Sequence, residues 1–456
     1  MDNVSNSNKN TQRAIIFQGG GGLGAYEAGV IKAIYDKLSS ENDKNKPLFD
    51  IVAGTSIGAI NGAVLVSQVL KNNGDWKTSI DNLQNFWTKR LSSDPDYESL
   101  WSSWFFQRDS STAASEEAAR RYYSVMRFFA DGAPNVFSQV EQEDDDRFYD
   151  NIFNKLLRSD NAPLERSIKK YADFPIATSF DQKQPRFLIV SVDVLEMAAV
   201  TFDSYKKEDG SRKSEYANYD KRKEDGEEIK KYVIKYDDGI SIDHVMASAS
   251  VPGFYDYTKI EAEQSPIDDS SNSTQSTRYF WDGAILSNTP LREVIHAHRD
   301  YWTYVEKKPT PDLDVYIVDL WPSNEYKGTP PSDNNGMKDL QDMIQFSDKT
   351  IYDEKVAKIT TDYIDLSRKL IELAKAKGAT NGDIDTILNE NATSASRSGE
   401  NRQYRKLLEG RFNLSNVLRI ERSADLDSIY GKIGDFTSKT IKTLIQQGYD
   451  DTIHQI

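Results

Sequence analysis

The first part of the chain alternates short apolar runs with helical patterns. Residues 14–17 and 49–54 are apolar runs that predict buried strands, and residues 26–38 and 57–70 carry apolar side chains at helical spacing. A repeated order of strand, loop and helix is typical of α/β folds, in which helices cover a parallel sheet. This pattern predicts that the chain begins with such a fold.

Later segments extend the pattern. Further strands are predicted at residues 174–180, 186–194 and 313–320, and in the segment "RYFWDGAI". The polar stretches 206–231 and 261–278 predict an exposed hairpin tip and an exposed loop. We therefore predict a three-layer α/β/α fold with a mainly parallel central sheet.

Other segments depart from this pattern. Residues 91–160, rich in aromatic and charged side chains, predict a mainly helical insertion in a catalytic domain of residues 13–325. Residues 326–456 predict a mainly helical C-terminal region that packs on this domain and contains one strand-like piece at 416–421. The polar residues 1–12 predict a disordered tail.

The aromatic residues of the insertion have two readings. They could form a lid or a membrane-contacting surface, because Trp and Tyr suit interfaces, or they could form a local helical core. The residues concerned are Trp101, Trp104, Phe105, Phe106, Tyr122, Tyr123, Phe128 and Phe129.

Composition narrows the classes of function. The 456 residues include 57 Lys and Arg against 72 Asp and Glu, and a formal net charge of −15 argues against a nucleic-acid partner. The sequence contains no cysteine, which removes disulfides, thiolate metal sites and cysteine nucleophiles. No apolar run is long enough to span a membrane, and the N-terminus lacks a signal-peptide pattern. We expect a cytoplasmic protein, with transient peripheral membrane contact as an open alternative.

A glycine-rich loop follows the first predicted strand. Gly19, Gly21 and Gly24 satisfy the dinucleotide fingerprint G-x-G-x-x-G. A glycine turn at the start of a helix stabilises any negative charge, however, because free backbone N–H groups and the helix dipole point at it. The loop is therefore compatible with a bound phosphate or with the oxyanion formed during ester cleavage.

The second predicted strand leads into "GTSIGA". Gly54, Ser56 and Gly58 form the pattern G-x-S-x-G between a strand and a helix, which is the nucleophile elbow. The tight turn exposes the serine hydroxyl, and the small neighbours avoid clashes. The N–H of Ile57, at the start of the helix, can then donate to a developing oxyanion.

The elbow changes the interpretation of the glycine loop. A dinucleotide site needs an acidic residue at the end of the second strand, but Asp50 lies at its start and Ser56 follows its end. The two loops are expected at the same edge of the sheet, where Gly20, Gly21 and Gly22 can donate N–H groups to an oxyanion on Ser56.

The base that activates Ser56 has several candidates in the sequence. The four histidines are His244, His296, His298 and His454, and His296 and His298 point in different directions if they lie on one helix. A buried carboxylate can also act as the base. Asp282-Gly283-Ala284 follows a predicted strand, whereas Asp131, in a second D-G-A, follows an apparent helix end and is read as structural.

Together these motifs resemble the patatin-like phospholipase family of lipid acyl hydrolases. The glycine loop, "GTSIG" and "DGA" occur in the family's order, Asn288 and Pro290 follow "DGA", and "ASASVPGFY" precedes it. The resemblance implies a dyad of Ser56 as nucleophile and Asp282 as base, without metal or cofactor. Gly19, Gly24, Gly54, Gly58 and Gly283 support these motifs.

The resemblance also bears on the substrate and the oxyanion hole. It implies a lipid or acyl-ester substrate and a role in lipid degradation. Many members carry Arg or Lys where this chain has Leu23, so backbone N–H groups of Gly20–Gly22 and Ile57 are expected to hold the oxyanion alone. The alternatives are an esterase or thioesterase for soluble acyl compounds, and a silent lipid- or nucleotide-binding protein.

Overall fold

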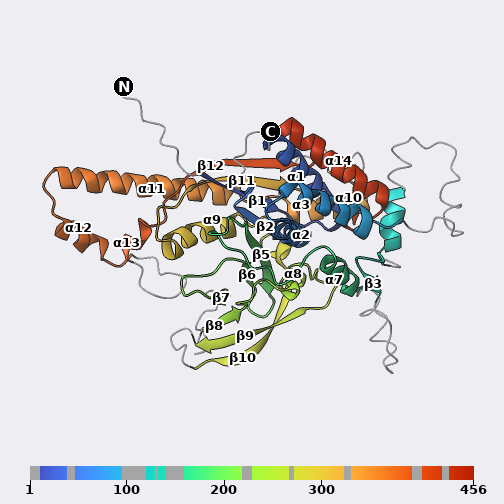
Figure 1. Ribbon diagram of the computed structural model, residues 1–456, viewed down its shortest axis with the longest axis horizontal. Helices are drawn as coiled ribbons and strands as arrows, with labels where there is room; N and C mark the ends of the chain where they lie inside the picture. Colours follow the sequence, from blue (N-terminus) through green and yellow to red (C-terminus); the bar gives the residue numbers. More distant parts are fainter. Residues whose placement is uncertain are drawn as a thin grey trace, which may run out of the picture.

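The computed structural model describes residues 11–38, 47–94, 120–128, 132–139, 159–217, 229–266, 272–322, 330–392, 403–423 and 431–456. Its centre is a ten-stranded sheet flanked by helices (Figure 1). The strand order is β12-β11-β1-β2-β5-β10-β9-β8-β7, and β6 pairs with β5 off this path. The predicted α/β class is thereby confirmed.

One half of the sheet is parallel and carries the first two predicted strands. Strand β1 (Thr11–Phe17) lies parallel to β11 (Asp312–Asp319) on one side and to β2 (Ile51–Thr55) on the other. Strand β12 (Leu414–Glu421) extends the sheet beyond β11, and β5 (Arg186–Asp193) follows β2, both in parallel. The carboxyl ends of these strands therefore meet at one edge, where α/β proteins place their sites.

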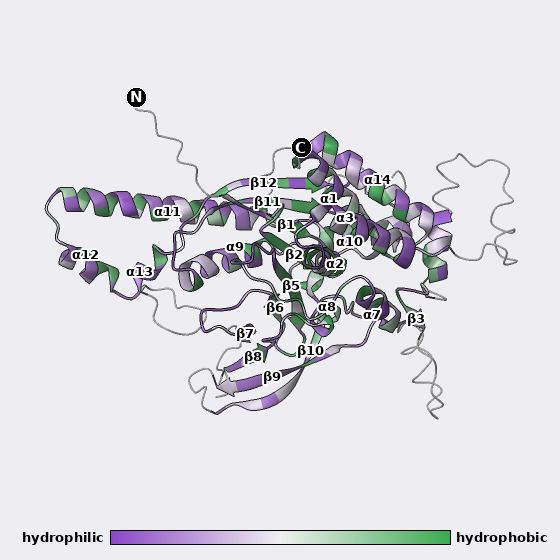
Figure 2. Ribbon diagram, viewed as in Figure 1, coloured by the Kyte–Doolittle hydropathy of each residue, from purple (hydrophilic) through white to green (hydrophobic). Residues whose placement is uncertain are grey.

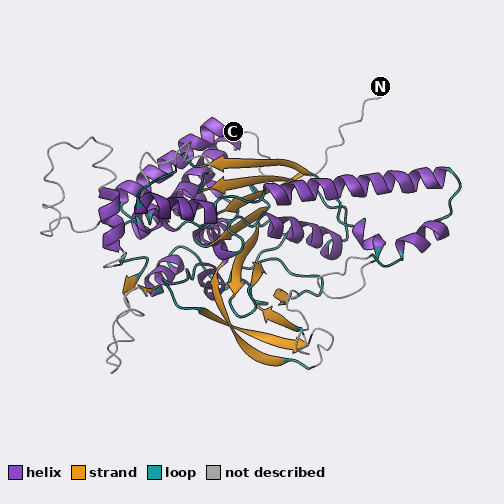
Figure 3. Ribbon diagram, turned by 180° about the vertical axis from the view of Figure 1, so that it is seen from behind, coloured by secondary structure: helices purple, strands orange, loops and turns teal. Residues whose placement is uncertain are grey.

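The other half of the sheet is antiparallel. Strand β5 pairs with β10 (Thr274–Asp282), and the sheet continues through the remaining strands beyond it (Figure 3). These are β9 (Thr258–Pro266), β8 (Lys230–Lys235) and β7 (Lys213–Ala217), whereas β6 (Ala198–Asp203) pairs antiparallel with β5 itself.

Alternate residues of the strands face two helical layers. Ile15 and Phe17 pack in one core cluster with residues of α1 (Ala25–Leu38) and α2 (Ile57–Lys71), whereas Ala14 and Ile16 pack in another. The first layer also contains α3 (Trp76–Asn85) and α14 (Ser438–Gln455), and the second contains α9 (Leu291–Asp300). Figure 2 shows the apolar positions gathered along the central strands. The period of two places successive side chains on opposite faces, as a three-layer fold requires.

The end of the chain contributes both to the sheet and to a helical layer. The predicted strand at 416–421 is confirmed as part of β12, and α14 packs along α1. Between them, the short helix η5 (Lys432–Gly434) lies against the glycine turn η1 (Gly21–Gly24). Residues from the far end of the sequence therefore reach the edge of the sheet where the site lies.

Two predictions on the antiparallel half are wrong. Residues 174–180 form no strand, and Ile176 makes only an isolated bridge to Ile240. Pro175, which lacks an N–H, cannot take a full part in a ladder. Residues 261–278 are mostly strand, in β9 and β10, because an antiparallel ladder with one face towards solvent accepts many polar side chains. The expected hairpin at 206–231 is present in part, as β7 pairs with β8.

Only part of the insertion can be compared with its prediction. Residues 120–128 are helical, as predicted, but the short strands β3 (Ser138–Gln139) and β4 (Ser159–Asp160) pair with each other instead of forming helix. The buried Phe128 contacts Phe436. Tyr122 is 48% exposed. Residues 1–10 of the predicted tail, and Trp101, Trp104, Phe105, Phe106, Phe129 and Asp131, lie outside the described residues. The tail prediction is wrong for Thr11 and Gln12, which begin β1 because they pair with β11. Of the helices that are described, none is both long enough and apolar enough to cross a membrane.

Candidate active site

Ser56 lies at the sharp turn between β2 and α2. Its backbone has φ 57° and ψ −126°, a strained conformation for a residue with a side chain. The Ser56 N–H donates to the hydroxyl of Ser248 over 3.0 Å, and that hydroxyl donates to the carbonyl of Val190 on β5 over 2.5 Å. The neighbouring strand thus holds the turn in its strained form, as expected for a nucleophile elbow.

The two glycines of the elbow are required by close packing. A Cβ on Gly54 would collide with the backbone of Gly58, and a Cβ on Gly58 would collide with the carbonyl of Phe17 at the end of β1. No side chain larger than hydrogen fits at either position without moving a main chain. The G-x-S-x-G pattern therefore has a steric reason in this fold.

Asp282 lies beside Ser56 at the end of β10. Its carboxylate accepts a hydrogen bond from the Ser56 side chain, and it also accepts one from the N–H of Ala284 over 2.8 Å. Gly283 follows, and a Cβ there would meet the carbonyl of Val190. Ser56 and Asp282 are 7% and 3% exposed. Two residues from distant parts of the sequence thus form a buried hydroxyl–carboxylate pair.

Burial makes Asp282 more basic than an ordinary carboxylate. Loss of hydration raises its pKa from 3.8 to about 7, although the hydrogen bonds from Ser56 and Ala284 oppose this rise. Between these two values the folded protein binds more protons than the unfolded chain, so stability falls as the pH rises from about 4 to 7. Above pH 7 the buried charge of Asp282 lowers the free energy of unfolding by about 4 kcal/mol. A buried carboxylate with such a pKa can accept a proton near neutral pH.

The glycine loop turns around Ser56. Gly19 approaches it most closely, because a Cβ there would lie 2.9 Å from the Ser56 Cβ. Gly20, which precedes η1, and Gly22 continue the turn, and Gly21, with φ 54°, lines the same pocket as Ser56 and Ile57. The Gly19 N–H donates to the side-chain oxygen of Asn288 over 2.9 Å, so this N–H already has a partner. Of the predicted oxyanion donors, Gly21 and Ile57 line the pocket with Ser56, whereas Gly20 lies against Leu320 and Trp321 and Gly22 lies against Ile433 and Asp435.

Leu23 and Gly24 lie on the inner side of this turn. Leu23 is completely buried in the core, so no side chain from this position faces the pocket. A Cβ on Gly24 would lie 2.6 Å from Ile57, which ties the glycine turn to the start of α2. Where many family members carry Arg or Lys, this chain therefore has an apolar side chain that packs in the core.

Side chains link the glycine loop to the loop after Asp282. Gln18 donates to the hydroxyl of Thr289 over 2.7 Å and accepts from the N–H of Leu320 over 2.9 Å. Asn288 accepts from Gly19 and donates to the carbonyl of Phe346 over 2.7 Å. The bonds to Thr289, Leu320 and Gly19 are buried, the bond to Phe346 is partly buried, and together they fix the glycine loop relative to the loop after Asp282.

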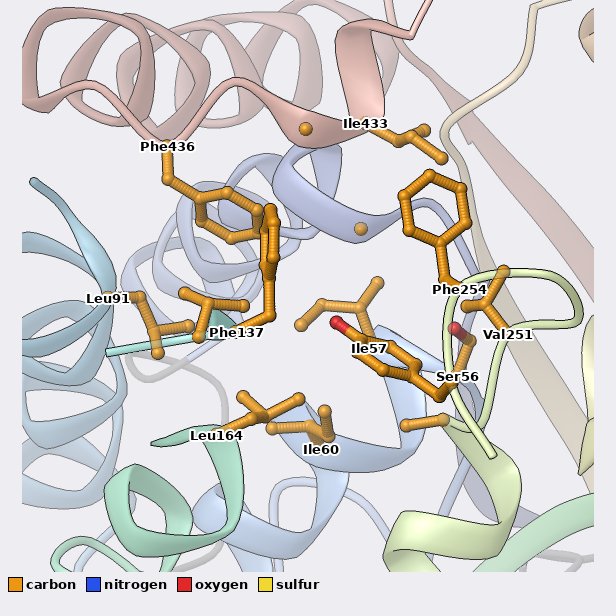
Figure 4. Close-up of a pocket in the computed structure, with 15 residues that line it drawn as sticks. Ser56, Ile57, Ile60, Leu91, Phe137, Leu164, Val251, Phe254, Ile433 and Phe436 are labelled. Atoms are coloured by element: carbon orange, nitrogen blue, oxygen red, sulfur yellow. The ribbon is translucent and has the colours of Figure 1, made fainter. Parts of the chain in front are cut away.

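An apolar pocket opens from Ser56 (Figure 4). Val251 and Phe254, which follow α8 (Ile242–Ser248), flank Ser56, and Leu91 and Phe137 lie at the opposite end. The further lining residues are Gly21, Ile57, Ile60, Val136, Leu164, Ala249, Tyr255, Ile433, Gly434 and Phe436. Apart from the hydroxyls of Ser56 and Tyr255, the side chains in this set are apolar. The pocket is suited to a hydrocarbon chain.

The histidines lie elsewhere. All four are in the described part of the chain, and none lines the pocket. His244 packs between Phe202 and Tyr236, and burial lowers its pKa to about 3. His298 contacts the carbonyl of Pro311 over 2.9 Å. Among the described residues, no group of three or more His, Cys, Asp or Glu is arranged to hold a metal ion.

Sequence reasoning missed some residues of the site. Ile433 and Phe436 close one side of the pocket, and backbone carbonyls of Ile433 and Asp435 lie against Gly21 and Gly22. No local pattern distinguishes this segment, because only the tertiary fold brings it to the glycine turn. Ser248 lay within the quoted segment "ASASVPGFY", but its bond to Ser56 was not expected.

Comparison with known proteins identifies one family. The family model of the patatin-like phospholipases matches residues 15–295, a range that includes Ser56 and Asp282. Solved structures that resemble the chain include VipD from Legionella pneumophila, with a TM-score of 0.32 and 11% sequence identity. That alignment covers 97% of this chain and 66% of the VipD chain, so this chain spans just under two thirds of VipD. Among curated proteins there is no match.

Proposed function

Since the chain belongs to the patatin-like phospholipase family of lipid acyl hydrolases, we propose that it cleaves fatty-acyl esters with Ser56 as nucleophile and Asp282 as base. The observation that carries this proposal is the buried hydrogen bond from Ser56 to Asp282 at the end of an apolar pocket. A carboxylate whose pKa is raised to about 7 is basic enough to receive the proton of the attacking hydroxyl.

The reaction proceeds in two steps. The Ser56 oxygen attacks the ester carbonyl while its proton passes to Asp282, and the tetrahedral intermediate collapses to an acyl-enzyme. The alcohol leaves with the proton from Asp282. Water then attacks the acyl group, gives a proton to Asp282, and releases the fatty acid as Ser56 recovers that proton. Asp282 thus acts as base and acid in turn, and no further group is consumed.

Backbone N–H groups stabilise the oxyanion in this scheme. Ile57 begins α2, so its N–H has no partner within the helix and adds to the positive end of the helix dipole. Gly21 lines the pocket from the opposite turn. Leu23 is buried, and the described residues that line the pocket include no Lys or Arg, so the charge of the intermediate is met by these donors, together with Gly20 and Gly22.

The assay that tests the proposal compares two kinds of substrate. Vesicles of mixed phospholipids and soluble short-chain p-nitrophenyl esters are incubated with the protein, and the products are identified by mass spectrometry. We expect free fatty acids from the vesicles. Cleavage of the soluble esters alone would favour a soluble-ester esterase, and cleavage of neither would favour a silent binding protein.

The pocket makes a further prediction about chain length. Leu164 on α7 (Ala162–Lys169) lines the pocket and is 5% exposed. Leu164→Trp should fill this space and lower kcat/KM for p-nitrophenyl palmitate by about tenfold or more, while the butyrate ester is affected only a few-fold. Leu164→Met, which conserves volume, is the matched control. Equal losses on both esters would mean that acyl chains do not lie in this pocket.

A further inference from the structure

The helix α11 (Ile351–Ala376) carries apolar side chains on its exposed face. It extends away from the sheet, and apolar positions recur along its length (Figures 1 and 2). Single exposed apolar residues are common, but a continuous row of them marks a contact surface. The row consists of Tyr352, Val356, Ile359, Tyr363, Leu366, Leu370 and Leu373, which are 42 to 74% exposed. We call these seven residues the α11 seam.

The spacing of the α11 seam is that of a coiled coil. Successive members are four and three residues apart in strict alternation, which is the a/d pattern of a heptad repeat. The helix already has a different face that packs on its own fold. Ile364 is 8% exposed, Ala357 packs on a core cluster, and Thr361 donates to the carbonyl of Phe412 over 2.9 Å. The seam is therefore an additional apolar stripe, not the one that holds α11 in place.

We propose that the α11 seam pairs with the α11 seam of a second copy of this chain, as an antiparallel two-helix coiled coil. We place the two-fold axis between Ile364 and Asp365. Each heptad position a of one copy then faces a heptad position d of the other copy. Tyr363 then faces Leu366 of the second copy, and the outer layers follow in the same register. All seam residues except Tyr352, at one end, are covered in this arrangement.

The charges beside the seam favour the antiparallel direction. On one flank Asp362 and Lys369 occupy equivalent heptad positions, and this axis brings Asp362 of each copy beside Lys369 of the other. Thr360, Ser367 and Ala374 occupy the other flank and carry no charge. A parallel pair would place Asp362 beside Ser367 and Lys369 beside Ala374, without any opposite charge. The antiparallel pair thus has two complementary contacts that the parallel pair lacks.

The first experiment measures the mass of the full-length protein in solution by light scattering and sedimentation. We expect a dimer for the natural sequence and a monomer for Leu366→Glu/Leu370→Glu, since buried like charges oppose pairing. The control Glu372→Ser/Lys375→Ser changes exposed residues outside the seam and should stay dimeric. A monomeric natural protein, or a seam variant that remains dimeric, would overturn the proposal and leave the seam for a different partner.

Charge variants test the register without removing the apolar seam. Asp362→Lys alone and Lys369→Asp alone should each weaken the dimer by about tenfold, and the double variant should recover it. Circular dichroism checks that each variant keeps its helices. Failure of the double variant to recover dimerisation would contradict this register.

The absence of cysteine from the sequence allows a direct test of direction. In the antiparallel pair, Val356 of one copy faces Leu373 of the other, whereas the two copies of either residue are about 25 Å apart. Mixed Val356→Cys and Leu373→Cys proteins should therefore form a disulfide-linked dimer on mild oxidation, and neither alone should. Crosslinking of each variant with itself would indicate a parallel pair and overturn the proposal.

Discussion

Replacing Ser56 by alanine should lower ester hydrolysis by at least about a thousandfold while the protein keeps its fold. The variant removes the attacking oxygen, and the hydroxyl of the neighbouring Thr55 donates a hydrogen bond to the carbonyl of Ser287 over 2.9 Å. Alanine fits the buried site, because the backbone bond from residue 56 to Ser248 does not need the hydroxyl. Initial rates on soluble esters and on vesicles measure the loss, and circular dichroism measures the fold.

The matched control is Ser67→Ala, on the same helix α2 about three turns away. Ser67 accepts a hydrogen bond from the N–H of Asp173 over 2.7 Å and does not line the pocket. This variant can lose stability, but its rate should stay within a few-fold of the natural protein. If Ser56→Ala retained more than a tenth of the activity, Ser56 could not be the nucleophile.

Replacing Asp282 by asparagine should lower kcat by about a hundredfold or more. The amide can still accept the bond from Ala284, but it cannot accept the proton of Ser56. In the natural protein, kcat/KM should rise with pH through about 7, as the buried Asp282 loses its proton. In the variant this step should be absent. The pH–rate profile therefore separates loss of the base from general damage.

Stability provides an independent readout of the same change. At pH 8, Asp282→Asn should raise the free energy of unfolding, because the neutral amide avoids the cost of a buried charge, which is at most about 4 kcal/mol. The gain should shrink towards pH 4, where the carboxyl is protonated in the folded protein and about half protonated in the unfolded chain. Urea unfolding at the two pH values measures it. A variant that is both inactive and less stable at pH 8 would indicate a structural role for Asp282.

Asp319 offers a control for the carboxylate. It also ends a strand of the sheet, and burial raises its pKa to about 7, but it accepts from the N–H of Trp321 and does not line the pocket. Asp319→Asn should keep its rate of ester hydrolysis within a few-fold of the natural protein.

Single replacements of His244, His296, His298 and His454 should also be tolerated. If one of these abolished activity while Asp282→Asn stayed active, a triad would have to replace the dyad.

The parts of the site that sequence predicted are those with local causes. The elbow follows from a strand, small residues and a helix start within ten residues, and Asp282 follows from a strand that opens into a loop. The G-x-G-x-x-G pattern alone did not distinguish a phosphate-binding site from an oxyanion hole. Only the position of Ser56 favoured the oxyanion hole. Local patterns, together with the family resemblance, thus pointed to Ser56, Asp282 and the turn between Gly19 and Gly24, and the chemical roles of these residues stay predictions.

The parts that sequence missed depend on long-range contacts. Ile433 and Phe436 reach the pocket because η5 packs on the glycine turn, a contact between the two ends of the chain. Strand β9 and the first residues of β10 were missed because strands with many solvent-facing polar side chains do not show an apolar pattern, whereas the end of β10 was predicted from "RYFWDGAI". The α11 seam, in contrast, is readable from its four-and-three spacing, but only the structure shows that this face is exposed.

The most direct test of the Ser56–Asp282 dyad is the site and rate of reaction with a fluorophosphonate, measured by mass spectrometry of the intact protein and of its peptides. The account predicts one adduct per chain, on Ser56, formed faster as the pH rises through about 7 and much more slowly in Asp282→Asn. An adduct on any other residue, or labelling of Asp282→Asn at the natural rate, would contradict it.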